Sequence, residues 1–313
     1  PHPPRIAIAP GPAPEAAVEA VGRAGGELVE PDRAEGLLWL DWRDTQALTD
    51  TLSGGPGIRW VQLPWAGVEH YVEAGVLDPE RTWTCAKGIY GEEVAEHALA
   101  LALALMRSLK VRARATRWDP AAAGLQLAGG TLYGGRVTLL GGGGIARALL
   151  RLLEPFSVEA TVVRREAEPL AGAARTFDTG RLLDALEGAD LVVVALALTA
   201  HTRGILGRRE MLAMGPRCHL VNVARGAHIV TDDLVDALRS GELGAAALDV
   251  TDPEPLPEGH PLWELDNCFI TPHVANPAVG ESNRLLLALF EDNVRRFALG
   301  QQLVGLVDPG LGY

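Results

Sequence analysis

Cysteine is scarce in this sequence, which holds 3 among 313 residues. Cys85, Cys218 and Cys268 lie far apart, inside apolar stretches, and show no metal-ligand spacing. An odd number of cysteines in such surroundings is typical of reduced, buried thiols rather than of a disulfide framework. The scarcity argues against a secreted, disulfide-stapled protein and predicts a cytoplasmic one.

The sequence also lacks a long uninterrupted apolar run. The N-terminal residues 1–5 contain no apolar core of the kind that a signal peptide carries. The longest apolar stretch, residues 94–106, includes Glu96 and His97. It falls well short of the roughly 20 apolar residues that a membrane helix needs. We therefore expect no membrane association and interpret the stretch as a buried helix.

Basic residues are not in excess. Lys and Arg number 28 against 40 Asp and Glu, which gives a formal net charge of −12 and a pI near 5.2. Nothing in this balance offers a basic face to phosphates, so nucleic acid and anionic membranes are excluded as partners. A small anionic ligand stays compatible, provided that its site is locally positive.

What the sequence does contain is enough apolar residues, 48% of the chain, for two domains with their own cores. Strand-like runs alternate with helical stretches over the first hundred residues and again from residue 136, which is typical of parallel sheets. The first strands are expected at residues 5–9, 36–40 and 58–62. A long helix, residues 92–111, is expected between the two series, and Thr231 is expected to cap a later helix.

A glycine-rich turn, with the sequence GGGGIA, opens the second series. In the pattern G-x-G-x-x-G/A, Gly141 permits a tight turn and Gly143 lets the backbone approach a pyrophosphate, while the small Ala146 allows close helix packing. The helix that begins at Gly144 and Ile145 offers free N–H groups to phosphates. We predict a dinucleotide site here. The alternative is a purely structural strand-to-helix turn.

The next predicted strand ends in two arginines, Arg164 and Arg165. A fold that prefers NAD usually has Asp or Glu at this point, which bonds the ribose 2′-hydroxyl. Two guanidinium groups would instead hold a 2′-phosphate. The sequence therefore favours NADP(H). The alternative is that both arginines are solvated charges and that NAD(H) binds without an acidic partner.

Three polar residues each follow an apolar run that reads as a buried parallel strand. They are Arg225 after residues 219–223, Glu254 after residues 245–250 and His273 after residues 268–270. Ligands of open α/β sheets bind beyond the carboxyl ends of the strands. An arginine, a carboxylate and a histidine gathered there could bind a small acid and move a proton.

Each of the three residues has a possible chemical role. His273 would protonate the oxygen of a keto acid, Glu254 would orient the ring and favour its charged form, and Arg225 would bind the substrate carboxylate. Each also has a non-catalytic interpretation: Arg225 as a strand-end charge, Glu254 as a turn residue and His273 as a capping histidine. Spacing alone does not show that the three converge.

The C-terminal half resembles the D-isomer-specific 2-hydroxyacid dehydrogenases. The resemblance is carried by LVNVARG at 220–226, DDLVDAL at 232–238, AALDV at 246–250, DPEPLP at 252–257 and TPH at 271–273. It runs almost without gaps over residues 135–275 and more loosely over the rest. It implies that Arg225, Glu254 and His273 form the catalytic set.

The resemblance also implies further cofactor contacts. The residue matching Asp249 contacts the nicotinamide carboxamide, and those matching Ala197, Thr202 and Val223 line the cofactor cleft. The implied fold class is α/β, with two Rossmann-like or flavodoxin-like domains, parallel sheets and the active site in the interdomain cleft. A substrate domain, residues 1–105 completed by 275–313, would flank an NAD(P)-binding domain at 106–274.

The substrate loop is expected in the N-terminal part. By the resemblance, the backbone N–H groups of the loop with Ala66 and Gly67 hold the carboxylate, although a simple strand-to-helix turn would look the same. Tyr90 stands where many members have an Asn facing the substrate, which predicts a reshaped pocket. His97, on an apolar helix, is interpreted as structural.

The function that these observations favour is an NADPH-dependent reductase of small 2-keto acids, such as glyoxylate and hydroxypyruvate, that forms D-2-hydroxy acids. Two alternatives stay open: an NAD-dependent dehydrogenase of another D-2-hydroxy acid, and a non-catalytic dinucleotide-binding sensor. The family is typically dimeric through segments like 109–130. We therefore expect a homodimer, with Trp118 at the interface and near the partner's active site.

Overall fold

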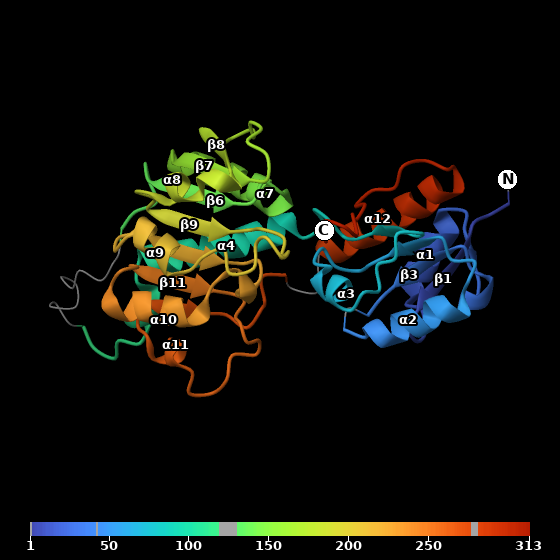
Figure 1. The fold of residues 1–313 in the computed structure, drawn as a ribbon, viewed down its shortest axis with the longest axis horizontal. Coiled ribbons are helices and arrows are strands. Elements are labelled where there is room, and N and C mark those ends of the chain that lie inside the picture. Colours follow the sequence, from blue (N-terminus) through green and yellow to red (C-terminus); the bar gives the residue numbers. More distant parts are fainter. Residues whose placement is uncertain (1, 42, 119–129, 277–280) are drawn as a thin grey trace. The chain divides into compact units, whose positions relative to one another are not determined.

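The computed structural model describes residues 2–41, 43–118, 130–276 and 281–313, and the chain divides into two compact units (Figure 1). Unit 1 comprises Pro1–Tyr90 and Ala278–Tyr313, and unit 2 comprises Gly91–Pro277. Helix α4 (Gly91–Met106) belongs to unit 2 by its contacts. The functional domain boundaries stated above stay a prediction.

Unit 1 contains a five-stranded parallel sheet with the order β2-β1-β3-β4-β5. Its strands are β1 (Arg5–Ala9), β2 (Glu27–Leu28), β3 (Gly36–Trp39), β4 (Trp60–Gln62) and β5 (Thr82–Thr84). Its helices are α1 (Glu15–Arg23), α2 (Thr45–Gly54), α3 (Glu69–Glu73), α12 (Glu281–Ala298) and the short 3-10 helix η1 (Pro31–Arg33). Side chains alternate along each strand, so the sheet packs into two apolar layers, one on each face.

Buried polar groups tie the last helix of unit 1 to its sheet. Asn293 on α12 is fully buried and donates from Nδ2 to Gln62 Oε1 at 2.8 Å. The Thr84 hydroxyl donates to the same Gln62 oxygen at 2.8 Å and accepts the indole N–H of Trp60 at 2.8 Å. Each of these bonds satisfies a donor that would be costly to bury alone. The network fixes the carboxyl end of β4, from which the loop with Ala66 and Gly67 departs.

Unit 2 contains a seven-stranded parallel sheet with the order β12-β11-β10-β9-β6-β7-β8. Its strands are β6 (Arg136–Leu140), β7 (Glu159–Arg164), β8 (Arg175–Asp178), β9 (Leu191–Val194), β10 (His219–Asn222), β11 (Ala245–Leu248) and β12 (Cys268–Ile270). Besides α4, its helices are α5 (Leu109–Ala113), α7 (Gly144–Leu153), α8 (Leu182–Leu186), α9 (Arg208–Met214), α10 (Thr231–Ser240) and α11 (Pro261–Glu264), with 3-10 turns η2 (Glu154–Phe156), η3 (Thr179–Arg181) and η4 (Gly226–His228). The strand order reverses between β6 and β9, which is the switch point where such sheets bind ligands. The α/β class with two parallel sheets is confirmed.

Two local predictions were wrong. The helix expected over 92–111 ends at Met106 and resumes as α5, because Ser108 adopts a left-handed conformation with φ of 49°. Thr231 does not cap α10 but is its first residue, and its hydroxyl donates to the Asp252 carbonyl at 2.7 Å. That bond ties α10 to the loop that carries Glu254.

Among the described residues, none of the helices is long and apolar enough to cross a membrane. The three cysteines are buried and free. Burial raises the pKa of the Cys85 thiol to about 11 and the pKa of Cys218 and of Cys268 to about 12. The thiols are therefore protonated and poorly reactive at neutral pH.

Candidate active site

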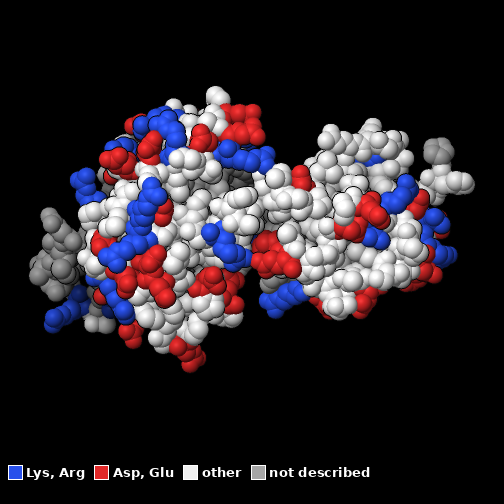
Figure 2. Space-filling view, viewed as in Figure 1, with Lys and Arg blue, Asp and Glu red and all other residues white. Residues whose placement is uncertain are grey.

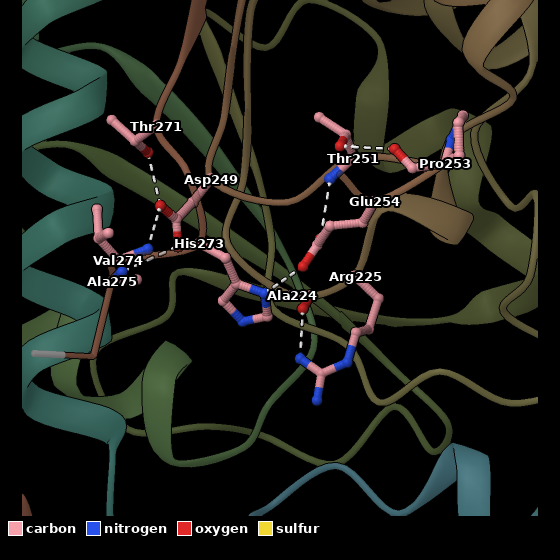
Figure 3. A network of polar contacts seen from close by, with 10 residues as sticks. All are labelled: Ala224, Arg225, Asp249, Thr251, Pro253, Glu254, Thr271, His273, Val274 and Ala275. Atoms are coloured by element: carbon pink, nitrogen blue, oxygen red, sulfur yellow. Dashed lines mark hydrogen bonds and ion pairs between the residues drawn. The ribbon is translucent and has the colours of Figure 1, made fainter. Parts of the chain in front are cut away.

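Three neighbouring strands bring Arg225, Glu254 and His273 to one edge of the unit 2 sheet. Arg225 follows β10, Glu254 follows β11 and His273 follows β12, and these strands pair in the order β12-β11-β10. Figure 3 shows the carboxylate of Glu254 joined to the ring of His273, with Arg225 beside them. The sequence-predicted trio therefore lies together at the carboxyl ends of parallel strands.

Glu254 and His273 form a direct pair. His273 Nδ1 lies 2.7 Å from Glu254 Oε1, and the second carboxylate oxygen accepts the N–H of Thr251 at 3.3 Å. Burial raises the pKa of Glu254, but the hydrogen bond and charge of His273, the Thr251 N–H and the charge of Arg225 together hold it below the ordinary value. The carboxylate therefore stays ionised at neutral pH and accepts a hydrogen bond from the N–H at Nδ1 of the ring.

A glycine allows the loops of Arg225 and Glu254 to touch. A Cβ atom on Gly226 would lie 2.0 Å from the carbonyl carbon and oxygen of Thr251, so no side chain fits at this position. Arg225 itself is half-buried, and its Nη1 donates to the Ala224 carbonyl at 2.7 Å. The close backbone contact fixes the arginine next to the acid.

Buried Asp249 holds the segment around His273. Its Oδ1 accepts the hydroxyl of Thr271 at 2.6 Å and the N–H of Val274 at 2.9 Å, and its Oδ2 accepts the N–H of Ala275 at 3.0 Å. The Asp249 carbonyl accepts the N–H of His273 at 2.8 Å. His273 is thereby held at a φ of 53°, which non-glycine residues seldom adopt.

His97 lies beside this carboxylate. Its Nε2 is 3.3 Å from Asp249 Oδ1 and 3.1 Å from the hydroxyl oxygen of Thr271. Because the hydroxyl proton goes to Asp249, the Thr271 oxygen accepts from His97. The apolar helix around His97 indicated a structural role, and the structure gives the ring polar partners at the site.

The glycine-rich turn lies at the switch point of the sheet. Gly141 has a φ of 114°, and a Cβ there would lie 2.3 Å from the Ala195 carbonyl oxygen. A Cβ on Gly143 would meet no atom within 4 Å, so the space in front of this residue is open. Helix α7 begins at Gly144, followed by half-buried Ile145, and within the described part of the chain no side chain caps its first N–H groups. Open space next to these donors fits the pyrophosphate of a dinucleotide.

Arg164 ends β7 and lies against the same turn. Its Cδ and Nε would be 3.2 Å and 3.3 Å from a Cβ on Gly142. Its guanidinium is 3.7 Å from Glu168, and Arg165 Nε is 3.7 Å from Glu166. Ion pairs of this length near the surface contribute little to stability, so a bound phosphate group can replace the carboxylates.

The remaining predicted cofactor residues belong to the loops after β9 and β10. Thr202 donates from its hydroxyl to the Ala197 carbonyl at 2.7 Å and accepts the Thr199 N–H at 2.8 Å, which closes the turn. Val223 is buried at the end of β10, and its N–H is bonded to the Val194 carbonyl at 3.4 Å. The two loops therefore follow adjacent strands on one side of the switch point.

Ala66, Gly67 and Tyr90 belong to unit 1. The Tyr90 hydroxyl donates to the Pro64 carbonyl at 2.8 Å, and its ring lies 5.3 Å from the ring of Trp65. The Ala66 side chain is exposed. Tyr90 therefore supports the loop that was predicted to bind the substrate carboxylate.

Sequence reasoning passed over Asn222 and His228, two fully buried residues that hold the Arg225 loop. Asn222 donates from Nδ2 to the Arg225 carbonyl at 2.8 Å and accepts the Ala224 N–H at 3.0 Å. His228 Nδ1 lies 3.0 Å from the same carbonyl. The available signal was that both are polar residues inside apolar runs. No group of three His, Cys, Asp or Glu side chains that could hold a metal occurs among the described residues.

A parallel sheet with a glycine turn at its switch point is the fold of dinucleotide-binding proteins. The family model described as D-isomer specific 2-hydroxyacid dehydrogenase, NAD binding domain, matches residues 99–275. The chain therefore belongs to the D-isomer specific 2-hydroxyacid dehydrogenase family, whose members are NAD(P)-dependent oxidoreductases.

Individual relatives agree with this membership. An uncharacterized protein in the proB 3′ region of Corynebacterium melassecola is 39% identical over 82% of this chain and 84% of its own. The human glyoxylate reductase/hydroxypyruvate reductase is 34% identical over 81% of this chain and 78% of its own. A Xanthobacter autotrophicus D-isomer specific 2-hydroxyacid dehydrogenase, solved with NADPH and MES, is 25% identical, covers all of both chains and has a TM-score of 0.83.

Proposed function

We propose that this protein reduces small 2-keto acids of the glyoxylate and hydroxypyruvate type to D-2-hydroxy acids with NADPH. The observation that carries the proposal is the 2.7 Å pair of His273 and Glu254, with Arg225 at the adjacent strand end. The human and mouse relatives named glyoxylate reductase/hydroxypyruvate reductase support the substrate class.

His273 is the proposed acid. When bound, the nicotinamide cofactor supplies a hydride to the keto carbon. Nδ1 of the ring is bonded to Glu254, so Nε2 is the nitrogen that donates a proton to the developing alkoxide. The ionised carboxylate of Glu254 stabilises the imidazolium before the transfer and fixes the ring in one orientation.

Arg225 is the proposed carboxylate-binding residue. A guanidinium has five N–H donors in one plane, so the bond from Nη1 to the Ala224 carbonyl fixes its orientation and still permits a bidentate pair. In a molecule with a net charge of −12, this group would make the site locally positive. The N–H groups of Ala66 and Gly67, and the aromatic side chain of Tyr90, are the proposed substrate-binding groups of unit 1.

The proposed cofactor is NADPH. The open space at Gly143 and the first N–H groups of α7 fit a pyrophosphate, and Arg164 at the end of β7 replaces the acid that would repel a 2′-phosphate. The proposed neighbours of the nicotinamide are Asp249, Ala197, Thr202 and Val223. The Xanthobacter relative was solved with NADPH and one from Rhizobium etli with NADP, each 25% identical to this chain.

An assay of glyoxylate, hydroxypyruvate and larger 2-keto acids with NADPH or NADH tests the proposal. We expect NADPH oxidation with the small acids and slower turnover with NADH. Turnover with NADH alone would indicate the NAD-dependent alternative. NADPH binding without turnover of any 2-keto acid would instead identify a dinucleotide sensor and overturn the proposal.

One variant and a matched control test the preference for NADPH over NADH. Arg164→Ala should raise KM for NADPH by about 10-fold or more and leave KM for NADH nearly unchanged, because only the former carries the 2′-phosphate. Arg175→Ala, which removes an exposed arginine paired with Glu159 on the neighbouring strands, should change neither. Equal effects on both cofactors would contradict the role of Arg164.

A further inference from the structure

His228 is a fully buried histidine that the proposed mechanism does not use. It lies in the short turn η4, three residues after Arg225. Its Nδ1 is 3.0 Å from the carbonyl oxygen of Arg225, and its Nε2 is 3.3 Å from the carbonyl oxygen of Ala197. One ring therefore connects the loop after β10 with the loop after β9.

Both of these partners are acceptors, so a ring nitrogen can bond either of them only as an N–H donor. A neutral imidazole has one N–H and can bond one carbonyl at a time, whereas an imidazolium bonds both. An apolar side chain at this position has no N–H group and could bond neither carbonyl. The ring is therefore better suited to holding the two loops at a fixed separation than an apolar residue of similar size would be.

The two carbonyls are also held by their own loops. The Arg225 carbonyl accepts a second bond from Asn222 Nδ2 at 2.8 Å, and the Ala197 carbonyl accepts one from the Thr202 hydroxyl at 2.7 Å. The backbone adds to the connection, because the Leu206 N–H is bonded to the His228 carbonyl at 3.0 Å. His228 thus joins two loops that are each already ordered.

We propose that His228 is a positioning residue, which sets the distance between the substrate-binding Arg225 and the cofactor loop at Ala197. This inference rests on the proposed function, in which Arg225 holds the keto acid and Ala197 lies next to the cofactor. Hydride transfer requires that the donor and acceptor atoms be held close together, and a displacement of about 1 Å can lower the rate about 100-fold. A tie between these two loops controls that distance without touching either ligand.

Two substitutions separate the two bonds. The amide nitrogen of Asn is as many bonds from Cα as Nδ1 of His, and the amide nitrogen of Gln as many as Nε2. His228→Asn should keep the bond to Arg225, with KM for the keto acid close to wild type and Kd for NADPH raised about 3- to 10-fold. His228→Gln should keep the bond to Ala197 and show the opposite pattern. His228→Leu should show both defects.

The measurements are Kd for NADPH by fluorescence titration, KM and kcat with the best keto acid, and the melting temperature of each variant. A merely structural role would lower the melting temperature of His228→Asn and His228→Gln and affect both ligands alike. Equal changes in the two variants, or none, would overturn the inference.

If the variants do not fold, a measurement on the wild-type protein tests the same inference. With ¹⁵N-labelled histidine, NADPH should shift the Nε2 resonance of His228, and oxalate, an unreactive dicarboxylate, should shift the Nδ1 resonance. If neither resonance shifts, the proposed connection of the two loops by His228 is refuted. This readout needs no turnover, so loss of the proposed reductase activity and loss of the tie are distinguishable.

Discussion

Glu254 and His273 meet at a place where both side chains are more than one-third exposed, at 41% and 47%. An ion pair this accessible to water contributes little to the free energy of unfolding. Yet the chain holds His273 in a left-handed conformation and gives both oxygens of Glu254 a partner. The pair is therefore better explained by chemistry than by stability.

Glu254→Gln tests this role through pH. The lowered pKa of Glu254 means that its contribution to stability is present above its ordinary value of 4.5 and is lost as the pH falls through the lower folded-state value. The small difference in melting temperature from wild type should therefore be present at neutral pH and vanish in acid. The interaction with His273 that lowers the pKa of Glu254 is mutual, so its removal should move to lower pH the limb of kcat/KM that falls with rising pH. If this limb does not move, the two residues are not coupled. The control is Glu258→Gln, which changes an exposed acid of the same loop and should behave as wild type.

Arg225 gives a second prediction at the scale of one residue. Arg225→Lys keeps a positive charge but loses the planar pair of donors, so kcat/KM for 2-keto acids should fall by about 100-fold or more. The binding of NADPH should change little. Arg217→Ala, which removes an exposed arginine after α9, serves as the control. If the lysine variant turned over 2-keto acids nearly as fast as the wild type, the proposed role of Arg225 in binding the substrate carboxylate would be wrong.

The strand-to-helix turn from β6 to α7 shows two different needs for glycine within one element. Gly141→Ala should lower the free energy of unfolding by about 2 kcal/mol or more, because its φ of 114° and the Ala195 carbonyl at 2.3 Å leave no place for Cβ. Gly143→Ala should leave that free energy nearly unchanged and raise Kd for NADPH by about 10-fold, because its Cβ would fill open space that the pyrophosphate needs. Denaturant titration and fluorescence titration measure the two effects. Equal destabilisation by both variants would contradict this division.

At the same scale, the sequence predicted those elements whose signals are local. Buried parallel strands such as β6 and β12 appear as continuous apolar runs, and residues 268–270 were predicted with the bounds that the structure has. The two-residue β2 and the partly exposed β8 gave no such run and were not predicted. The break at Ser108 was missed because nothing in the apolar period of α4 marks it.

The site shows the same division. Arg225, Glu254 and His273 could be predicted because each follows an apolar run and matches a family motif. His228 and Asn222 could not, because their role depends on which carbonyls the folded chain brings to them. Sequence spacing gives the strand on which a residue lies, whereas long-range hydrogen bonds depend on the strand order.

For the whole molecule, the expected homodimer is a further prediction. Trp118 is 90% exposed and Leu109 is 48% exposed, while residues 119–129 of the proposed interface lie outside the described residues. Light scattering should give twice the chain mass of 33.2 kDa. Leu109→Glu should give monomers, whereas Leu212→Glu, at a similarly exposed site on α9, should not. A wild-type monomer would exclude a contribution of Trp118 to a partner's active site.

The two segments of unit 1 have a consequence for synthesis on the ribosome. The layer that Ile6 and Trp60 form on one face of the sheet is completed by Phe290 and Val294 of α12, which are translated after unit 2. Unit 2 is one continuous segment and can fold as soon as it emerges, while the N-terminal sheet must wait with apolar surface exposed. A chain truncated before Glu281 should therefore contain a protease-resistant unit 2 and a protease-sensitive unit 1. The synthesis of α12 would thus determine when the apolar surface of unit 1 is buried and no longer open to chaperones.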